Sequence, residues 1–182
     1  MEAINYLLKF VLDTLVMVLI FRVWLQIVKA DFYNSLSQFI LKVTNPLVIP
    51  LRRVIPGFAG LDLATIILIL LISSSKFVII PMLNGGPFEP LTALYLGVLF
   101  SIKQVGFLLF IVMLVMAVMS WVVQGYNPTQ VIFHQLSEPF LKPIRRIVPN
   151  IGGLDLSVLI AFLILNVLNI VLSGSIPYWG ML

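Results

Sequence analysis

The sequence predicts an all-α integral membrane protein with four transmembrane helices in two parallel, pseudo-symmetric repeats. Of its 182 residues, 61% are hydrophobic and only 10% are charged, whereas soluble domains are about 45 to 50% apolar and 25% charged. In addition, residues 46–63 read PLVIPLRRVIPGFAGLDL and residues 139–156 read PFLKPIRRIVPNIGGLDL, an ungapped match at an offset of 93 residues with 9 of 18 positions identical. Such a match indicates an internal duplication.

Four apolar segments are long enough to cross a hydrocarbon core, which needs about 20 helical residues. They cover residues 4–28, 61–83, 105–123 and 154–173. The first segment contains Lys9, Asp13 and Arg22. Because no small-x-small cleavage site follows it, we expect a retained anchor rather than a signal peptide.

Residues 91–102 are apolar but too short to cross a bilayer. Joined to the run that ends at residue 123, they would form a helix of about 50 Å, which is too long for one straight span. We therefore expect a short re-entrant or interfacial piece, joined near Lys103 and Gly106 to the third span.

A short amphipathic segment precedes each copy of the repeated motif, and we expect both to lie on the cytoplasmic membrane surface. In the first, an apolar face consists of Leu36, Phe39, Ile40, Val43 and Leu47. Asn45-Pro46 is predicted to cap a new helix there, and Pro50 to kink or break it, because proline lacks the amide that bonds the carbonyl four residues earlier. Asn127-Pro128 is predicted to cap the second segment, which carries Val131, Ile132 and Leu136.

We call residues 46–60 and 139–153 the collars. Seven of the eleven basic residues lie in the two loops that contain them: Lys29, Lys42, Arg52, Arg53, Lys142, Arg145 and Arg146. The positive-inside rule places these loops in the cytoplasm and both chain termini outside. The chain then divides into a first repeat (residues 1–83), an extracytoplasmic linker (84–90) and a second repeat (91–182).

The collars are the first candidate site. Guanidinium groups bind phosphates in bidentate fashion, so the basic residues are expected to contact anionic phospholipid head groups or a protein partner; the alternative is that they only set topology. These residues are Arg52, Arg53, Lys142, Arg145 and Arg146. Asp62 and Asp155 lie in the first turn of the following span, where a carboxylate complements the helix dipole, and either can pair with Arg22.

A polar seam is the second candidate site. At the offset of 93, Ser73 and Lys76 align with Asn166 and Asn169. Lys76 lies about 21 Å along its helix from Asp62, and Asp13 lies about 24 Å from Lys29, so Asp13 and Lys76 are at matching depths and can pair. We expect these five residues, Asp13, Ser73, Lys76, Asn166 and Asn169, to line a seam between the repeats. The seam would either join the helices through hydrogen bonds or form an ion or proton pathway.

Chemistry based on metals, cofactors or nucleophiles is not expected. The chain has no cysteine and one histidine, His134, which excludes thiolate sites and most metal centres. His134 and Glu138 are spaced i, i+4 but are expected to form a solvated face. Because the chain carries a net charge of +4, we expect it to interact with anionic lipid head groups rather than with nucleic acid.

The repeated P-x-x-x-P-x-R-R-x-x-P-x-x-x-G-L-D-L at residues 46–63 and 139–156 closely resembles the YggT (YlmG) family, here as two tandem copies of its domain. The resemblance implies a small protein of the bacterial inner membrane. Relatives are associated with osmotic or extracytoplasmic stress and with division-gene neighbourhoods, and photosynthetic relatives with cytochrome b6 maturation and nucleoid partition. A haem-carrying role transfers poorly, because His134 is the one imidazole available.

These observations lead us to expect a non-enzymatic protein that organises or assists assembly at the membrane through its collars. The alternative is a small transport or channel component that uses the polar seam. A homo-oligomer or a membrane-protein partner is compatible with either function.

Overall fold

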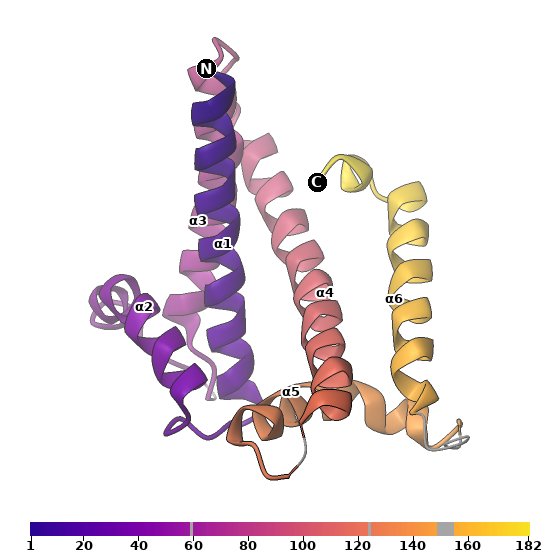
Figure 1. The fold of residues 1–182 in the computed structure, drawn as a ribbon. Helices are drawn as coiled ribbons and strands as arrows, with labels where there is room; N and C mark the ends of the chain where they lie inside the picture. The colour runs from indigo at the N-terminus through magenta and orange to yellow at the C-terminus, as the bar shows by residue number, and fades with distance from the viewer. Residues whose placement is uncertain (59, 124, 149–154) are drawn as a thin grey trace.

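The computed structural model describes residues 1–58, 60–123, 125–148 and 155–182 (Figure 1). Its helices are α1 (Glu2–Ile27), α2 (Ser35–Arg52), α3 (Leu63–Leu83), α4 (Pro90–Val122), α5 (Pro128–Arg145), α6 (Leu156–Ser175) and the 3₁₀ helix η1 (Trp179–Met181). Within the described residues, α1, α3, α4 and α6 are long and apolar enough to cross a membrane. The expected class, an all-α membrane protein, is confirmed.

The two repeats follow the same plan, in which two long helices flank a shorter surface helix. Figure 1 shows α2 and α5 at one end of the molecule and the chain termini toward the other end. The order α1–α2–α3 therefore runs in the same direction as α4–α5–α6. The repeats differ in packing, because α1 and α3 lie side by side whereas α6 stands apart from α4 along much of its length (Figure 1).

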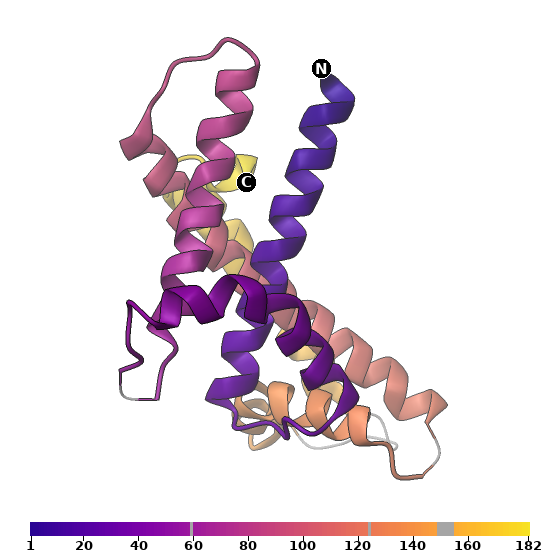
Figure 2. The same ribbon diagram turned by 90° about the vertical axis from the view of Figure 1, so that its left-hand side faces the viewer.

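Helix α4 is a single continuous helix of 33 residues, so the prediction that residues 91–102 form a separate re-entrant or interfacial piece, joined near Lys103 and Gly106 to the third span, is wrong. No proline interrupts α4 after its first residue, and its excess length is accommodated by an inclined path across the bundle (Figure 2). Close packing against α3 fixes that path. A Cβ added at Gly97 would lie 2.7 Å from the backbone nitrogen of Ser74, so glycine is required at the crossing.

Helix α2 also differs from expectation. It begins after Asn34, whose side chain accepts a hydrogen bond from the Leu36 amide, and it continues through Pro46 and Pro50, so the predicted cap at Asn45 is wrong. Of the kink or break expected at Pro50, the break does not occur, and Figure 2 shows α2 bending along its length. Both prolines are exposed. Water or head groups can therefore solvate the carbonyls that the prolines leave without an amide donor, and the helix persists. In α5, by contrast, the predicted Asn127-Pro128 start is confirmed, with Asn127 accepting from the amides of Thr129 and Gln130.

The hydrophobic core lies toward the collar end of the bundle. Its fully buried side chains come from α1, α2, α4 and α5: Val16, Leu19, Val48, Val112, Met113, Ile132, Leu136 and Leu141. The other half of α1 is exposed, with Ile4, Tyr6, Leu7 and Phe10 uncovered. The core therefore holds the surface helices against the spans and positions the collars.

Candidate functional site

Each collar is joined to the span that follows it through one arginine and the aspartate at the start of that span. Arg52 donates from Nε and Nη2 to the Asp62 carboxylate, at 3.2 and 2.5 Å. At the same offset of 93 residues, Arg145 donates from Nε and Nη2 to Asp155 Oδ2, at 3.0 and 2.8 Å. The first arginine of each pair therefore ties the end of the surface helix to the start of the next span.

Both aspartates also cap those spans. Asp62 accepts from the amide and hydroxyl of Thr65, and Asp155 accepts from the amide of Ser157. Burial raises the pKa of the Asp62 carboxyl, but the hydrogen bonds from Arg52 and Thr65 outweigh burial, so its pKa lies below its ordinary value. The pKa of Asp155 is likewise lowered, because the bonds from Ser157 and Arg145 outweigh its burial.

Arg22 joins three helices at the first collar. It is 3% exposed, its Nη1 donates to Thr44 Oγ1 and Asn45 Oδ1 of α2, and its Nε lies 3.8 Å from Asp62 Oδ2. Asp62 and Asp155 were both predicted as partners of Arg22, and in the structure the partner is Asp62. In the second repeat Arg145 instead bridges Asp155 and Glu138, with 2.6 Å from its Nη1 to Glu138 Oε2.

The second arginine of each pair faces outward next to an exposed aliphatic side chain. Arg53 and Arg146 are exposed, and the following residues, Val54 and Ile147, are 81% and 83% exposed. These four residues correspond pairwise at the offset of 93. Lys142 is also exposed, beside a cleft of about 430 Å³ that includes His134 and Glu138. The remainder of the second collar, from Pro149 to Gly153, lies outside the described residues.

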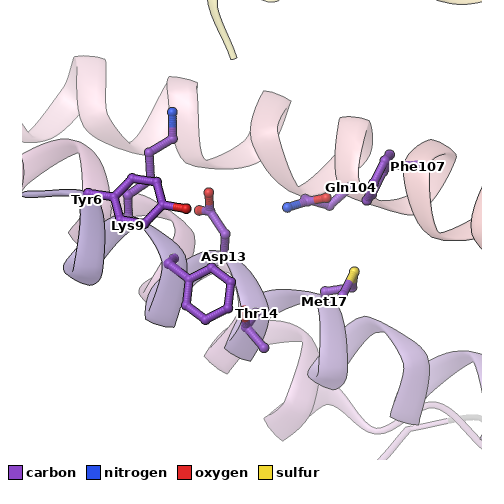
Figure 3. Close-up of a pocket in the computed structure, with 8 residues that line it drawn as sticks. Tyr6, Lys9, Asp13, Thr14, Met17, Gln104 and Phe107 are labelled. Carbon is purple, nitrogen blue, oxygen red and sulfur yellow. The ribbon is translucent and has the colours of Figure 1, made fainter.

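A cleft lined mainly by apolar surface lies between α1 and α4, and Asp13 is one of the residues that line it. Asp13 Oδ1 accepts from Lys76 Nζ of α3 at 2.5 Å, as the matching depths predicted, and the Asp13 side chain remains 25% exposed. The cleft has a volume of about 320 Å³. Figure 3 shows Tyr6 from the same helix and Gln104 from α4 directed toward the carboxylate, whereas the amino group of Lys9 points away.

The structure divides the expected polar seam into two groups. Ser73 is fully buried and accepts from Ser101 Oγ of α4 at 2.9 Å, on the same side as the Asp13–Lys76 pair. Asn166 and Asn169 instead line a cavity that faces Lys103 and Gly106. Residues 103, 106 and 110 of α4 lie about 140° to 200° around the helix from residue 101, at 100° per residue, so α4 separates the two groups.

Ser101 and Gln104 were not predicted from the sequence as site residues, and Lys103 was predicted only as a boundary between segments. Lys103 Nζ donates to the carbonyl oxygens of Trp179 and Leu182. Trp179 is 4% exposed, and its Nε1 donates to Asn169 Oδ1. The preceding residue, Tyr178, adopts a left-handed conformation with φ of 68°. A lysine within an apolar run was the available signal for a partner at that depth.

These two repeats match a known family of proteins. The model of the family described as CCB3/YggT matches residues 1–83 and 95–176. The chain belongs to the CCB3/YggT family. The two matched segments of CCB3/YggT correspond to α1–α3 and to nearly all of α4–α6.

Several CCB3/YggT relatives cover almost the whole chain. An uncharacterised protein from the proC 3′ region of Vibrio alginolyticus is 46% identical over 98% of both chains. The uncharacterised protein YggT of Escherichia coli K12 is 41% identical over 93% of this chain and 88% of its own, and an uncharacterised protein of Pseudomonas aeruginosa is 39% identical over 97% of this chain and 93% of its own. No solved structure matches this chain.

Proposed function

We propose that this CCB3/YggT protein is a non-enzymatic, multi-pass protein of the bacterial inner membrane whose collars bind anionic phospholipid on the cytoplasmic side. The observation that carries the proposal is the repeated outward pair, Arg53–Val54 and Arg146–Ile147. An aliphatic side chain inserts below the head groups while the neighbouring guanidinium binds phosphate, and each basic residue near an anionic leaflet contributes about 1 kcal/mol.

The surface helices support the same assignment. One face of α2 packs on the bundle through Ile40, Thr44 and Val48, whereas Phe39 and Val43 are exposed. An exposed apolar stripe beside basic residues is the pattern of a helix that lies in a membrane interface. The two collars then bind the same leaflet at two points. Such binding suits a role in organising or assisting assembly at the membrane, during osmotic or extracytoplasmic stress or during cell division.

Lipid retention tests the collar assignment. The full chain is purified in mild detergent, offered phosphatidylglycerol and phosphatidylcholine in equal amounts, and the bound lipids are counted by native mass spectrometry. We expect an excess of phosphatidylglycerol that Arg53→Gln/Arg146→Gln removes and that salt reduces. Lys9→Gln, which changes a lysine near the opposite end of α1, is the matched control. Equal retention by the double variant and the control would refute the proposal.

Ion or proton transport is a second candidate function, favoured by the partly exposed Asp13 carboxylate in the α1–α4 cleft. Proton flux into liposomes containing the purified protein tests it, with Asp13→Asn as the variant and Lys42→Gln, outside the cleft, as the control. Flux that Asp13→Asn abolishes would support transport. Flux no greater than that of empty liposomes would exclude it.

A further inference from the structure

The cavity between α4 and α6 occupies the place that an ion pair fills in the first repeat. At the offset of 93 residues, Asp13 corresponds to Gly106 and Lys76 to Asn169. The Asp13–Lys76 pair fills the space between α1 and α3. Gly106 has no side chain, and a Cβ added there would have nothing within 4 Å. The second repeat therefore has a cavity of about 310 Å³ at the equivalent position.

Both ends of this cavity are closed along the helix axes. At one end the rings of Phe110 and Phe162 meet with 4.6 Å between centroids. At the other end Trp179 is held between Lys103 and Asn169. Lys103 and Phe110 are seven residues apart on α4, so the space between the two ends is about 10 Å long, which fits a single substituted ring.

At the Trp179 end of the cavity, Lys103 and Asn169 have hydrogen-bond donors that are available to a ligand. Asn169 Oδ1 already accepts from Trp179 Nε1, so its amide NH₂ is the part that can meet a ligand. The Lys103 ammonium has three N–H groups, and its hydrogen bonds within the described residues, to the carbonyls of Trp179 and Leu182, use two of them. A ligand that satisfies this end of the cavity must therefore offer hydrogen-bond acceptors.

The depth of these groups restricts the ligand further. Asn166 and Asn169 lie about 15 and 20 Å along α6 from its start at Leu156, inside a hydrocarbon core about 30 Å thick. Phospholipid head groups lie outside that core. A lipid-soluble quinone, by contrast, carries two carbonyl acceptors on a planar ring that dissolves in hydrocarbon and packs on aromatic side chains.

We propose that the α4–α6 cavity binds the ring of a lipid-soluble quinone. One ring carbonyl accepts from Asn169 Nδ2 and Lys103 Nζ, and the ring packs against Phe107, Phe110 and Phe162. The isoprenoid tail leaves between α4 and α6 into the bilayer. This site is independent of the collars, and it requires no anionic lipid.

Tryptophan quenching measures this binding in the full-length protein. Trp24→Phe and Trp121→Phe leave Trp179 at the cavity as the sole tryptophan, and the purified protein in detergent is titrated with decylubiquinone. We expect saturable quenching. Gly106→Leu, which fills the cavity, and Asn169→Leu, which removes the donor, should each weaken the apparent affinity at least tenfold. Gly174→Leu is the control, because a Cβ at Gly174 also has nothing within 4 Å and Gly174 is not part of the cavity.

Several results would overturn the proposal. Quenching that rises linearly with the same slope in all variants would show only partitioning of the quinone into the micelle. Quenching of Trp179 by a dibrominated phosphatidylcholine that decylubiquinone does not relieve would show that the cavity holds an acyl chain. If Gly106→Leu does not give monodisperse protein, Asn169→Leu decides the test, because that substitution adds no bulk toward α4.

Discussion

Asp13 on α1 and Lys76 on α3 form an ion pair, 2.5 Å between Oδ1 and Nζ, within the membrane-spanning part of the bundle. Lys76 Nζ also lies 3.7 Å from the ring centroid of Phe100 on α4, a cation–π contact between the two repeats. One ammonium group therefore links three helices. Its surroundings leave no other carboxylate partner among the described residues.

Breaking this pair from either side is expected to destabilise the protein, whereas replacing both residues is not. A buried charge without its partner costs about 3 to 5 kcal/mol, but a well-packed apolar pair of similar volume is often neutral. We expect Asp13→Leu to be more destabilising than Lys76→Met, because the Lys76 side chain is the more buried of the two. Unfolding midpoints in detergent check this, and a double variant no more stable than Asp13→Leu alone would contradict it.

The two collar aspartates are expected to differ in their contribution to stability. Asp62→Asn removes a carboxylate whose side chain is 2% exposed and leaves the buried Arg22 charge without its ion-pair partner, so we expect a loss of about 3 to 5 kcal/mol. Asp155 is 31% exposed, and its pair should contribute about 1 kcal/mol. The free energy of unfolding of each variant measures the difference. Equal losses would show that Arg22 does not depend on Asp62.

Acid should destabilise the protein through the same two carboxylates. Their pKa values are lowered in the folded state, so the stabilisation is complete above the ordinary aspartate pKa of about 3.9 and is lost as pH falls through the lower folded values. We expect a flat melting temperature from pH 7 to 5 and a steep fall below about pH 4. The melting temperature of Asp62→Asn/Asp155→Asn should fall less steeply, and a fall as steep as that of the wild type would contradict this.

The contact between α3 and α4 should be sensitive to a single methyl group. A Cβ at Gly97 would lie 2.7 Å from the nitrogen and 2.8 Å from the Cα of Ser74, and backbone atoms cannot move aside at low cost. We expect Gly97→Ala to destabilise the protein by about 1 to 3 kcal/mol. Gly174→Ala, in open space, should be neutral or slightly stabilising because alanine favours helix. Thermal unfolding of both variants makes the comparison.

Hydropathy, the repeat and the helix rise were enough to predict the number of spans, the bounds of all but the third, and one tertiary contact. The pairing of Asp13 with Lys76 followed from their distances to the ends of their helices, because depth in a membrane is one coordinate that a sequence specifies. The rotation of a helix about its axis is not specified in this way. For that reason the side of α4 that each polar residue faces, and hence the division of the seam, required the structure.

The differing roles of the adjacent arginines were also beyond the sequence. Arg52 and Arg53 are adjacent residues of the same type, so the sequence does not distinguish them. The turn between α2 and α3 decides which of them reaches Asp62. The prolines allowed two outcomes for a related reason. Pro46 and Pro50 each remove a backbone hydrogen bond, which predicts a kink or a break, but the choice between them depends on what reaches the freed carbonyls, which is a tertiary property.

The position of Arg22 constrains how the protein enters the membrane during synthesis. Its partners Thr44, Asn45 and Asp62 all follow it in the chain. Lys76, the partner of Asp13 on the same helix, also comes later in the chain. Asp13 lies near the centre of α1, where an unpaired carboxylate opposes insertion of a lone span by about 2.5 to 3.5 kcal/mol. Insertion of α1 therefore becomes more favourable once α3, which carries Lys76, has been synthesised. The two should partition from the translocon as one hairpin, and a ribosome stalled before residue 76 should leave α1 open to membrane quality control.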